Sequence, residues 1–245
     1  MILTRKFKSL IRKSLLIILL AGIGTQFCMA QKATTMDVAY AKQVEIAAFR
    51  QALGYSDGAT AAVHLNTLIA MGEKNWTDTL AVLYYNMGYY AQCNQVCNIL
   101  NQDAPRVLEM QAYCRKSLNM PLLAVDSFSK LVKLTKSKVH AYELASLQLQ
   151  LQRYLEFDGT IAMAEKFDNG KDAFISLSSG SDNQSQKVPV NVALLHLQAY
   201  KAVTLKEYDK AISIYNTALT QFPDFTLAKN NIVEIKKIME QAKNK

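Results

Sequence analysis

The chain has 245 residues, of which 50% are hydrophobic, 20% charged and 9% aromatic. This is the composition of a folded globular protein, and it excludes long-range disorder. Nine Gly and four Pro are too few for a turn-rich all-β protein of this length, and four Cys are too few for a disulfide scaffold. The formal net charge is +8, but five of the 28 basic residues lie within the first thirteen positions, which leaves 23 basic residues against 20 acidic ones. We therefore do not expect a nucleic-acid-binding surface.

The amino terminus has the pattern of a secretory signal peptide. Its basic residues precede an apolar run at 15–24, which is about ten residues long and shorter than the ~20 that a membrane-spanning helix needs. Cys28-Met29-Ala30 then offers small residues for cleavage before Gln31. A lipoprotein is not expected, because Phe27 stands where a small residue would be required. The pattern predicts export to the periplasm or cell envelope of a Gram-negative bacterium, and an uncleaved membrane anchor is the alternative.

Apolar residues recur at three- and four-residue spacing through almost the whole remaining chain, which predicts helices. The connections are short, so successive helices are expected to pack as antiparallel hairpins. Glycines follow the first two helices, and Asp103 and Pro105 mark a helix start. The expected helices are 37–53, 60–71, 76–92, 94–101, 103–118, 121–134, 139–154, 156–167, 191–205, 208–220 and 225–243.

Two of these helices recur without gaps at an offset of 87 residues. The segment LEMQAY at 108–113 matches LHLQAY at 195–200. The match continues at Leu118 and Leu205, and in the following helix at Ala124 and Ala211 and at Phe128 and Tyr215. Self-similarity over two consecutive helices is typical of a repeat array.

At these positions the chain resembles the tetratricopeptide repeat family, whose 34-residue helix hairpin has small residues at positions eight and twenty, an aromatic residue at twenty-four, Ala at twenty-seven and Pro at thirty-two. Small residues suit close helix crossings, and aromatic rings fill the space between neighbouring hairpins. The resemblance implies an all-α, right-handed solenoid of antiparallel hairpins. One hairpin, near Gly88, is about three residues short. The residues that match the packing positions are Gly88, Ala112, Ala124, Phe128, Ala145, Ala199, Ala211, Tyr215, Ala218 and Pro223.

One polar insertion interrupts the array. Phe157 and Ala211 hold equivalent positions 54 residues apart, which is one repeat plus 20 residues. The stretch 168–187, rich in Ser, Asn and Gln, has that length. It is expected to form either a small β-hairpin around Gly180 or a solvated loop. The expected organisation is a signal peptide at 1–30, a degenerate repeat or cap at 31–79, repeats at 80–167, the insertion at 168–190, and a final repeat with a capping helix at 191–245.

The resemblance also implies a concave groove lined by the first helix of each repeat. A tyrosine offers rigid contact area and a hydroxyl, which suits an extended protein or peptide partner. The same rings could instead pack against the neighbouring hairpin. A row of Lys and Arg is missing, so a clamp for an acidic peptide terminus is not expected. The groove residues carried over from the family are Tyr85, Tyr89, Glu109, Tyr113, Tyr142, His196 and Tyr200.

Three cysteines and three histidines remain to be placed. Cys93, Cys97 and Cys114 are expected to be buried small residues at helix contacts, with a disulfide to Cys114 as the alternative. A metal site is not expected, because no His lies near them and the histidines lack ligand spacing. The sequence contains no nucleophile elbow and no Gly-rich phosphate-binding motif, so no catalytic residue and no cofactor is predicted.

These observations predict a non-catalytic, exported scaffold that binds a protein or peptide and serves envelope assembly or secretion. No cofactor and no nucleic acid is expected, and membrane contact would come only through an uncleaved signal segment. One alternative is an accessory or small-molecule-binding protein that uses the insertion as a lid. The other is a structural protein that associates with itself through the terminal helix.

Overall fold

The computed structural model describes residues 37–168, 173–178 and 185–243. The expected signal peptide and its cleavage site, as well as Gly180 in the insertion, lie outside the described residues. No helix within these ranges combines the length and apolar character needed to span a bilayer. The chain divides into two units, Met1–Leu83 and Tyr84–Lys245, and each is described by itself.

The first unit contains a helical hairpin. A helix over 37–54 is followed by α2 (Gly58–Ala70), the 3-10 turn η1 (Lys74–Trp76) and the beginning of α3 (Thr77–Asn86). The carboxylate of Asp57 caps α2, because it accepts a hydrogen bond from the backbone N–H of Thr60 at 3.0 Å. The ring of Trp76 meets that of Phe49 edge-on, with centroids 5.4 Å apart, and so joins η1 to the first helix.

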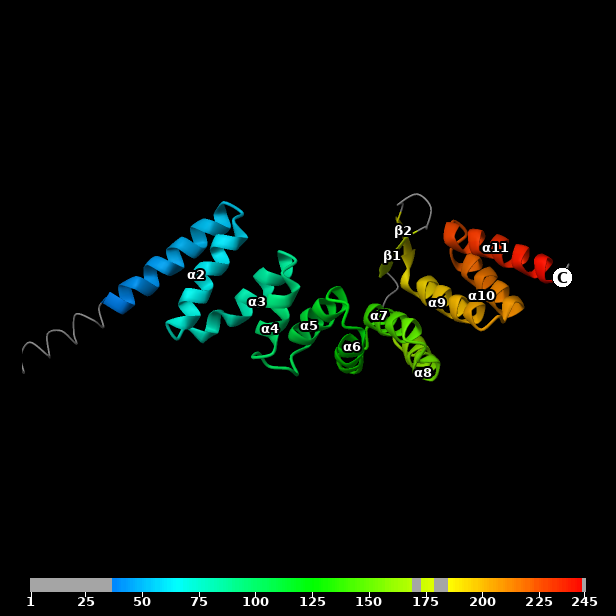
Figure 1. The fold of residues 1–245 in the computed structure, drawn as a ribbon, viewed down its shortest axis with the longest axis horizontal. Helices are drawn as coiled ribbons and strands as arrows, with labels where there is room; N and C mark the ends of the chain where they lie inside the picture. The colour runs from blue at the N-terminus through cyan, green and yellow to red at the C-terminus, as the bar shows by residue number, and fades with distance from the viewer. Residues whose placement is uncertain (1–36, 169–172, 179–184, 244–245) are drawn as a thin grey trace, which may run out of the picture. The chain divides into compact units, whose positions relative to one another are not determined.

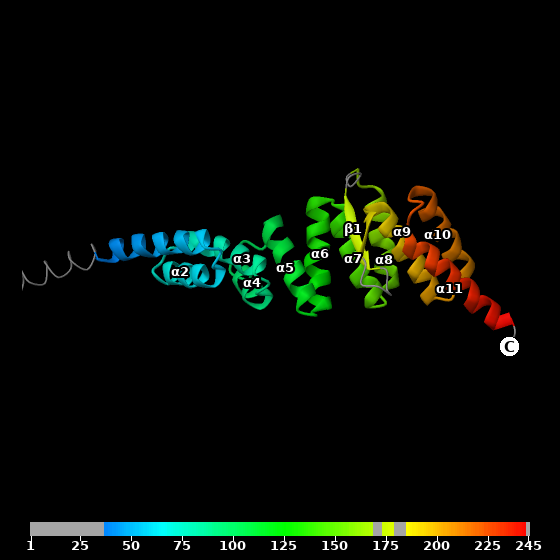
Figure 2. The same ribbon diagram turned by 90° about the horizontal axis from the view of Figure 1, so that it is seen from above.

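The second unit consists of successive antiparallel helices, which Figures 1 and 2 show as adjacent rods. Three hairpins are formed by α5 with α6, α7 with α8, and α9 with α10. The first helices of two hairpins, α7 and α9, also pack on each other. The predicted all-α solenoid is confirmed. The helices are α4 (Tyr90–Cys97), α5 (Pro105–Ser117), α6 (Pro121–Thr135), α7 (Lys138–Gln150), α8 (Tyr154–Glu165), α9 (Val190–Thr204), α10 (Tyr208–Gln221) and α11 (Thr226–Lys243).

A single helix over 76–92 is not formed, so that prediction is wrong, and the short helix expected over 94–101 runs instead over Tyr90–Cys97. The helix α3 ends at Asn86, because Gly88 adopts φ +74 and ends it with two hydrogen bonds. The N–H of Gly88 donates to the carbonyl of Tyr85, and the N–H of Tyr89 donates to that of Tyr84. A Cβ on Gly88 would meet nothing within 4 Å. Gly88 therefore serves the turn, and the expectation that it packs at a helix crossing is wrong.

The same turn recurs between the two helices of each later hairpin. Asn119, Gln152 and Lys206 have φ values of 55, 57 and 60, and the residue after each donates its N–H to a carbonyl five residues back. Gly88 and Asn119 are 31 residues apart in the sequence, Asn119 and Gln152 33, and Gln152 and Lys206 54. The spacing of these left-handed residues therefore follows the repeat register, with a shorter interval at the short hairpin and a longer one at the insertion.

The insertion forms a two-stranded antiparallel hairpin of β1 (Phe174–Ser178) and β2 (Ser185–Pro189), as one of the two sequence alternatives predicts. Ile175, Leu177 and Val188 are buried in the core of the second unit, and both strands pack against α9. The Gln186 side chain also joins the hairpin to the start of α11. Its amide N donates to the carbonyl of Asp224 at 2.6 Å, and its amide O accepts from the N–H of Thr226 at 3.1 Å.

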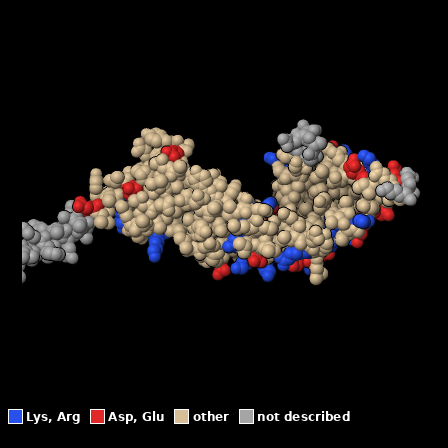
Figure 3. All heavy atoms as spheres, in the orientation of Figure 1, with Lys and Arg blue, Asp and Glu red and all other residues tan. Residues whose placement is uncertain are grey.

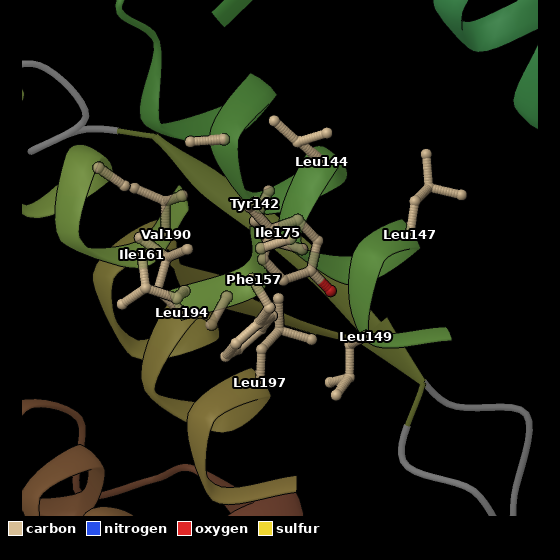
Figure 4. Close-up of a cluster of buried hydrophobic side chains, with 14 of the residues drawn as sticks. Tyr142, Leu144, Leu147, Leu149, Phe157, Ile161, Ile175, Val190, Leu194 and Leu197 are labelled. Carbon is tan, nitrogen blue, oxygen red and sulfur yellow. The ribbon is translucent and has the colours of Figure 1, made fainter. Parts of the chain in front are cut away.

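The small residues of the repeat pattern lie inside. Phe128 and Tyr215, which hold equivalent positions, are also fully buried. Figure 4 shows the part of the core where Phe157, Ile161 and Leu194 converge between α7, α8 and α9. Pro223 differs, since it is exposed in the turn after α10. The fully buried alanines are Ala112, Ala124, Ala145, Ala199, Ala211 and Ala218.

Candidate partner-binding site

A hollow of about 540 Å³ lies between α7 and α9. Tyr142 and Ser146 are four residues apart on α7, and His196 and Tyr200 are four apart on α9, so each pair shares one helix face. Because α7 packs on α9, the two faces together form the wall of the hollow. The remaining lining residues are Leu149, Gln150, Gln152, Tyr154, Leu197 and Thr204.

Three predicted groove residues are thus brought together, but their exposure differs. Tyr142 is 9% exposed and packs within the core, whereas Tyr200 is 53% exposed and presents its ring to solvent. The exposure of His196 is intermediate. Its partly buried ring contacts the rings of Tyr200, Tyr215 and Phe225, with centroids 5.9 to 6.4 Å away. Tyr200 is therefore the lining ring best placed to meet a partner.

A polar chain supports His196 from behind. Its Nδ1 lies 3.3 Å from the hydroxyl of Tyr215, and the same hydroxyl accepts a hydrogen bond from the side-chain amide of Asn231 at 2.8 Å. The chain runs from α11 through α10 to α9, so three helices fix the orientation of one imidazole. The hydroxyl of Tyr215, in an otherwise fully buried side chain, is thereby satisfied.

The hollow carries no ionised side chain at neutral pH among its described lining residues. Burial lowers the pKa of His196 from 6.5 to about 4, because the charged imidazolium is poorly solvated there. Burial likewise raises the pKa of Tyr142 to about 12. The other lining side chains are Tyr, Ser, Thr, Gln and Leu. On the face drawn in Figure 3, acidic and basic side chains over α6–α8 are interspersed rather than sorted by sign.

Two of the predicted groove residues on α5 make other contacts. Tyr113 packs edge-on against Phe128, with centroids 5.2 Å apart, and burial raises the pKa of its hydroxyl. The carboxylate of Glu109 pairs with Nε2 of His140 at 3.2 Å, and Nδ1 of the same imidazole lies 3.0 Å from the Thr135 hydroxyl. Neither residue lines the hollow between α7 and α9.

The predicted groove tyrosines around the α3–α4 turn also lie apart from this hollow. Tyr85 contacts Tyr90, with ring centroids 6.1 Å apart. Tyr89 precedes α4, is 44% exposed and contacts Tyr84 with centroids 6.3 Å apart. Because Gly88 ends α3, Tyr89 is not on the same helix as Tyr85, so the two rings do not form one helix face.

Similar solved structures share this architecture. A tetratricopeptide repeat protein from Parabacteroides merdae superposes with a TM-score of 0.59 at 13% identity, over 81% of this chain and 73% of its own. YrrB gives a TM-score of 0.57 at 11% identity, over 75% and 87%, and MamA gives 0.56 at 9% identity, over 73% and 90%. The fold is that of the tetratricopeptide repeat. No protein-family model and no curated protein matches the sequence itself.

Tetratricopeptide repeat folds present curved surfaces for protein interaction. Leu149, Gln150 and Thr204 lie further along α7 and α9 and also line the hollow, but the sequence analysis did not include them among the groove residues. Extending the same register by one helical turn would have found them. Gln152 lies in the turn after α7 and Tyr154 begins α8, and no periodic signal marks them as lining residues.

Cys93 and Cys97 on α4 and Cys114 on α5 are buried, and no disulfide joins these three described residues, so the disulfide alternative is not formed. The sulfur atoms of Cys93 and Cys97 are 3.9 Å apart. A hydrogen bond with Cys114 raises the pKa of Cys93 to about 12, so its thiol is protonated at neutral pH. Within the described ranges, no group of three or more His, Cys, Asp or Glu side chains is arranged to hold a metal ion.

Proposed function

We propose that the chain is a non-catalytic scaffold that binds a segment of a partner protein in the hollow between α7 and α9. The observation that carries this proposal is the meeting of Tyr142, His196 and Tyr200 from neighbouring repeats around one open hollow. Tyrosine is enriched among residues that dominate binding energy, because it combines a large rigid surface with a hydroxyl. One similar structure, YrrB, is described as a tetratricopeptide repeat protein with an unusual peptide-binding site, which supports a peptide as the bound form.

The chemistry of the lining favours an uncharged partner segment. A buried charge on the partner would find no opposite charge among the lining residues, so it would lose solvation without compensation. An apolar or aromatic side chain would meet Leu149, Leu197 and the ring of Tyr200 instead. We expect affinity for such a segment to change little with salt concentration, since screening weakens mainly charge–charge contacts.

We further propose that this binding takes place outside the cytoplasm, in envelope assembly or secretion. The support is the pattern of the first 30 residues, where basic residues, a short apolar run and small residues precede Gln31. Expression in a Gram-negative host followed by amino-terminal sequencing of the product tests this step. A mature protein that begins at Gln31 is expected, and an intact amino terminus in the cytoplasmic fraction would contradict it.

The binding proposal is tested with peptides selected from a displayed random library against the purified protein. Tyr200→Ala is expected to weaken the selected peptides at least tenfold, and Ser146→Arg, which places a long cation in the hollow, is expected to weaken them further. Tyr55→Ala is the matched control, because Tyr55 is a 75% exposed tyrosine outside the hollow. Equal binding by the Tyr200 and Tyr55 variants would reject the hollow as the site.

A further inference from the structure

The strand β1 has an outer edge whose backbone groups point away from β2. The N–H of Val190 donates to the carbonyl of Ala173 at 2.9 Å, directly beyond the last paired residues, Phe174 and Pro189. Antiparallel ladders alternate between hydrogen-bonded and non-hydrogen-bonded pairs. Pro189 therefore takes a non-hydrogen-bonded position, which suits its missing N–H. The same alternation directs the N–H and C=O groups of Phe174, Ser176 and Ser178 outward.

The two edges of the hairpin are protected differently. The outer edge of β2 carries Lys187 and Pro189, and Gln186 ties that strand to α11. Charged residues and prolines are the usual protection of an edge strand against pairing with another chain. The strand β1 has the sequence FISLS, with no charge and no proline, and its Phe174 is 55% exposed. Within the described residues, the edge of β1 thus lacks these protections against strand addition, whereas the edge of β2 has them.

We propose that β1 pairs with β1 of a second copy of this chain, antiparallel and centred on Ser176. In this register Ser176 faces its own copy, and Phe174 faces Ser178, which places a large exposed side chain opposite a small one. On the other face Ile175 lies opposite Leu177, so apolar groups meet apolar groups. Because β1 has no charged residue, the pairing brings no like charges together.

A second copy is chosen as the occupant because the outward residues of β1 are uncharged and complement themselves in size, with exposed Phe174 opposite Ser178. A two-fold axis through Ser176 lets each copy donate and accept the same hydrogen bonds, which is the condition for a closed isologous dimer. The result is a four-stranded sheet in the order β2–β1–β1–β2. Its two outer edges are the protected edges of β2, so the assembly ends at two copies.

Sedimentation velocity of the purified protein over a hundredfold concentration range tests the proposal. The wild-type chain is expected to shift from monomer to dimer. Ser176→Pro removes an outward donor without removing a hydrogen bond between β1 and β2, and it is expected to raise the dissociation constant at least tenfold. Ser185→Pro makes the same change on the outer edge of β2 and is expected to leave the dissociation constant unchanged.

A charge exchange distinguishes lost pairing from lost folding. Ser176→Lys and Ser176→Glu keep the backbone donor but place like charges at the two-fold axis, so each variant alone is expected to be monomeric. An equal mixture is expected to recover the dimer, because Lys and Glu then face each other. A wild-type chain that stays monomeric throughout, equal effects of the two proline variants, or a mixture that remains monomeric would each overturn the proposal.

Discussion

Acid should destabilise the second unit through one imidazole. The pKa of His196 falls from 6.5 to about 4 on folding because the ring is buried among Tyr200, Tyr215 and Phe225. Between these pH values the unfolded chain takes up a proton that the folded chain does not, so the free energy of unfolding decreases as the pH falls. The whole shift corresponds to about 3 kcal/mol, and about 2 kcal/mol of it is expected to be lost between pH 7.5 and pH 5.

The assay is urea denaturation followed by far-UV circular dichroism at both pH values, for the wild type and for His196→Gln. Carboxylates titrate in both proteins, so their contribution cancels in the difference between the two losses. The wild type is expected to lose about 2 kcal/mol more than the variant. His140→Gln is the control, since His140 pairs with Glu109 rather than being enclosed by rings. Equal losses in the wild type and His196→Gln would refute the argument.

Three further substitutions test the turns and the packing of the repeats. Lys206→Gly should raise the free energy of unfolding by about 0.5–1 kcal/mol in urea titrations, because the left-handed conformation of Lys206 (φ 60) strains a residue with a Cβ; no gain would contradict this. Ala211→Leu should cost about 1–3 kcal/mol by overpacking, whereas the same change at exposed Ala162 should be nearly neutral. Thr160→Val should cost about 1–3 kcal/mol, because the hydroxyl of Thr160 donates to buried Gln148 at 2.8 Å; an unchanged thermal midpoint would show that this contact is dispensable.

The residues that pack between the repeats were easier to predict from the sequence than the turns were. Ala124 and Ala211 stand 87 residues apart and are both fully buried, because a close helix crossing accepts little more than a methyl group and so leaves a residue signature. The turns leave no such signature: Gly, Asn, Gln and Lys all occupy the same left-handed position. Hairpin geometry imposes that conformation whatever the residue, which is why the break at Gly88 was missed.

In the candidate site, too, the repeat register predicts which helix face a residue occupies but not whether its side chain is buried. Tyr113 and Tyr200 hold equivalent positions, and sequence reasoning treated them alike. Tyr113 packs against Phe128, whereas Tyr200 is 53% exposed, although Tyr215 holds the position that corresponds to Phe128. Burial depends on side chains contributed by other helices, so a repeat register can place a ring on a face but cannot tell whether the ring is covered.

The packing of the hairpin argues against its use as a lid over the hollow. Ile175 and Leu177 are each 8% exposed and Val188 is fully buried, so lifting the hairpin from α9 would expose three apolar side chains at about 1.5–3 kcal/mol each. Even about 4 kcal/mol would keep the open form below roughly one molecule in a thousand. Hydrogen exchange of dilute protein measures this: the amides of Ile175 and Val188, a hydrogen-bonded pair, should be protected at least ~1,000-fold relative to outward-facing Ser176. If the amides of Ile175 and Val188 were protected no more than that of Ser176, the hairpin could still act as a lid.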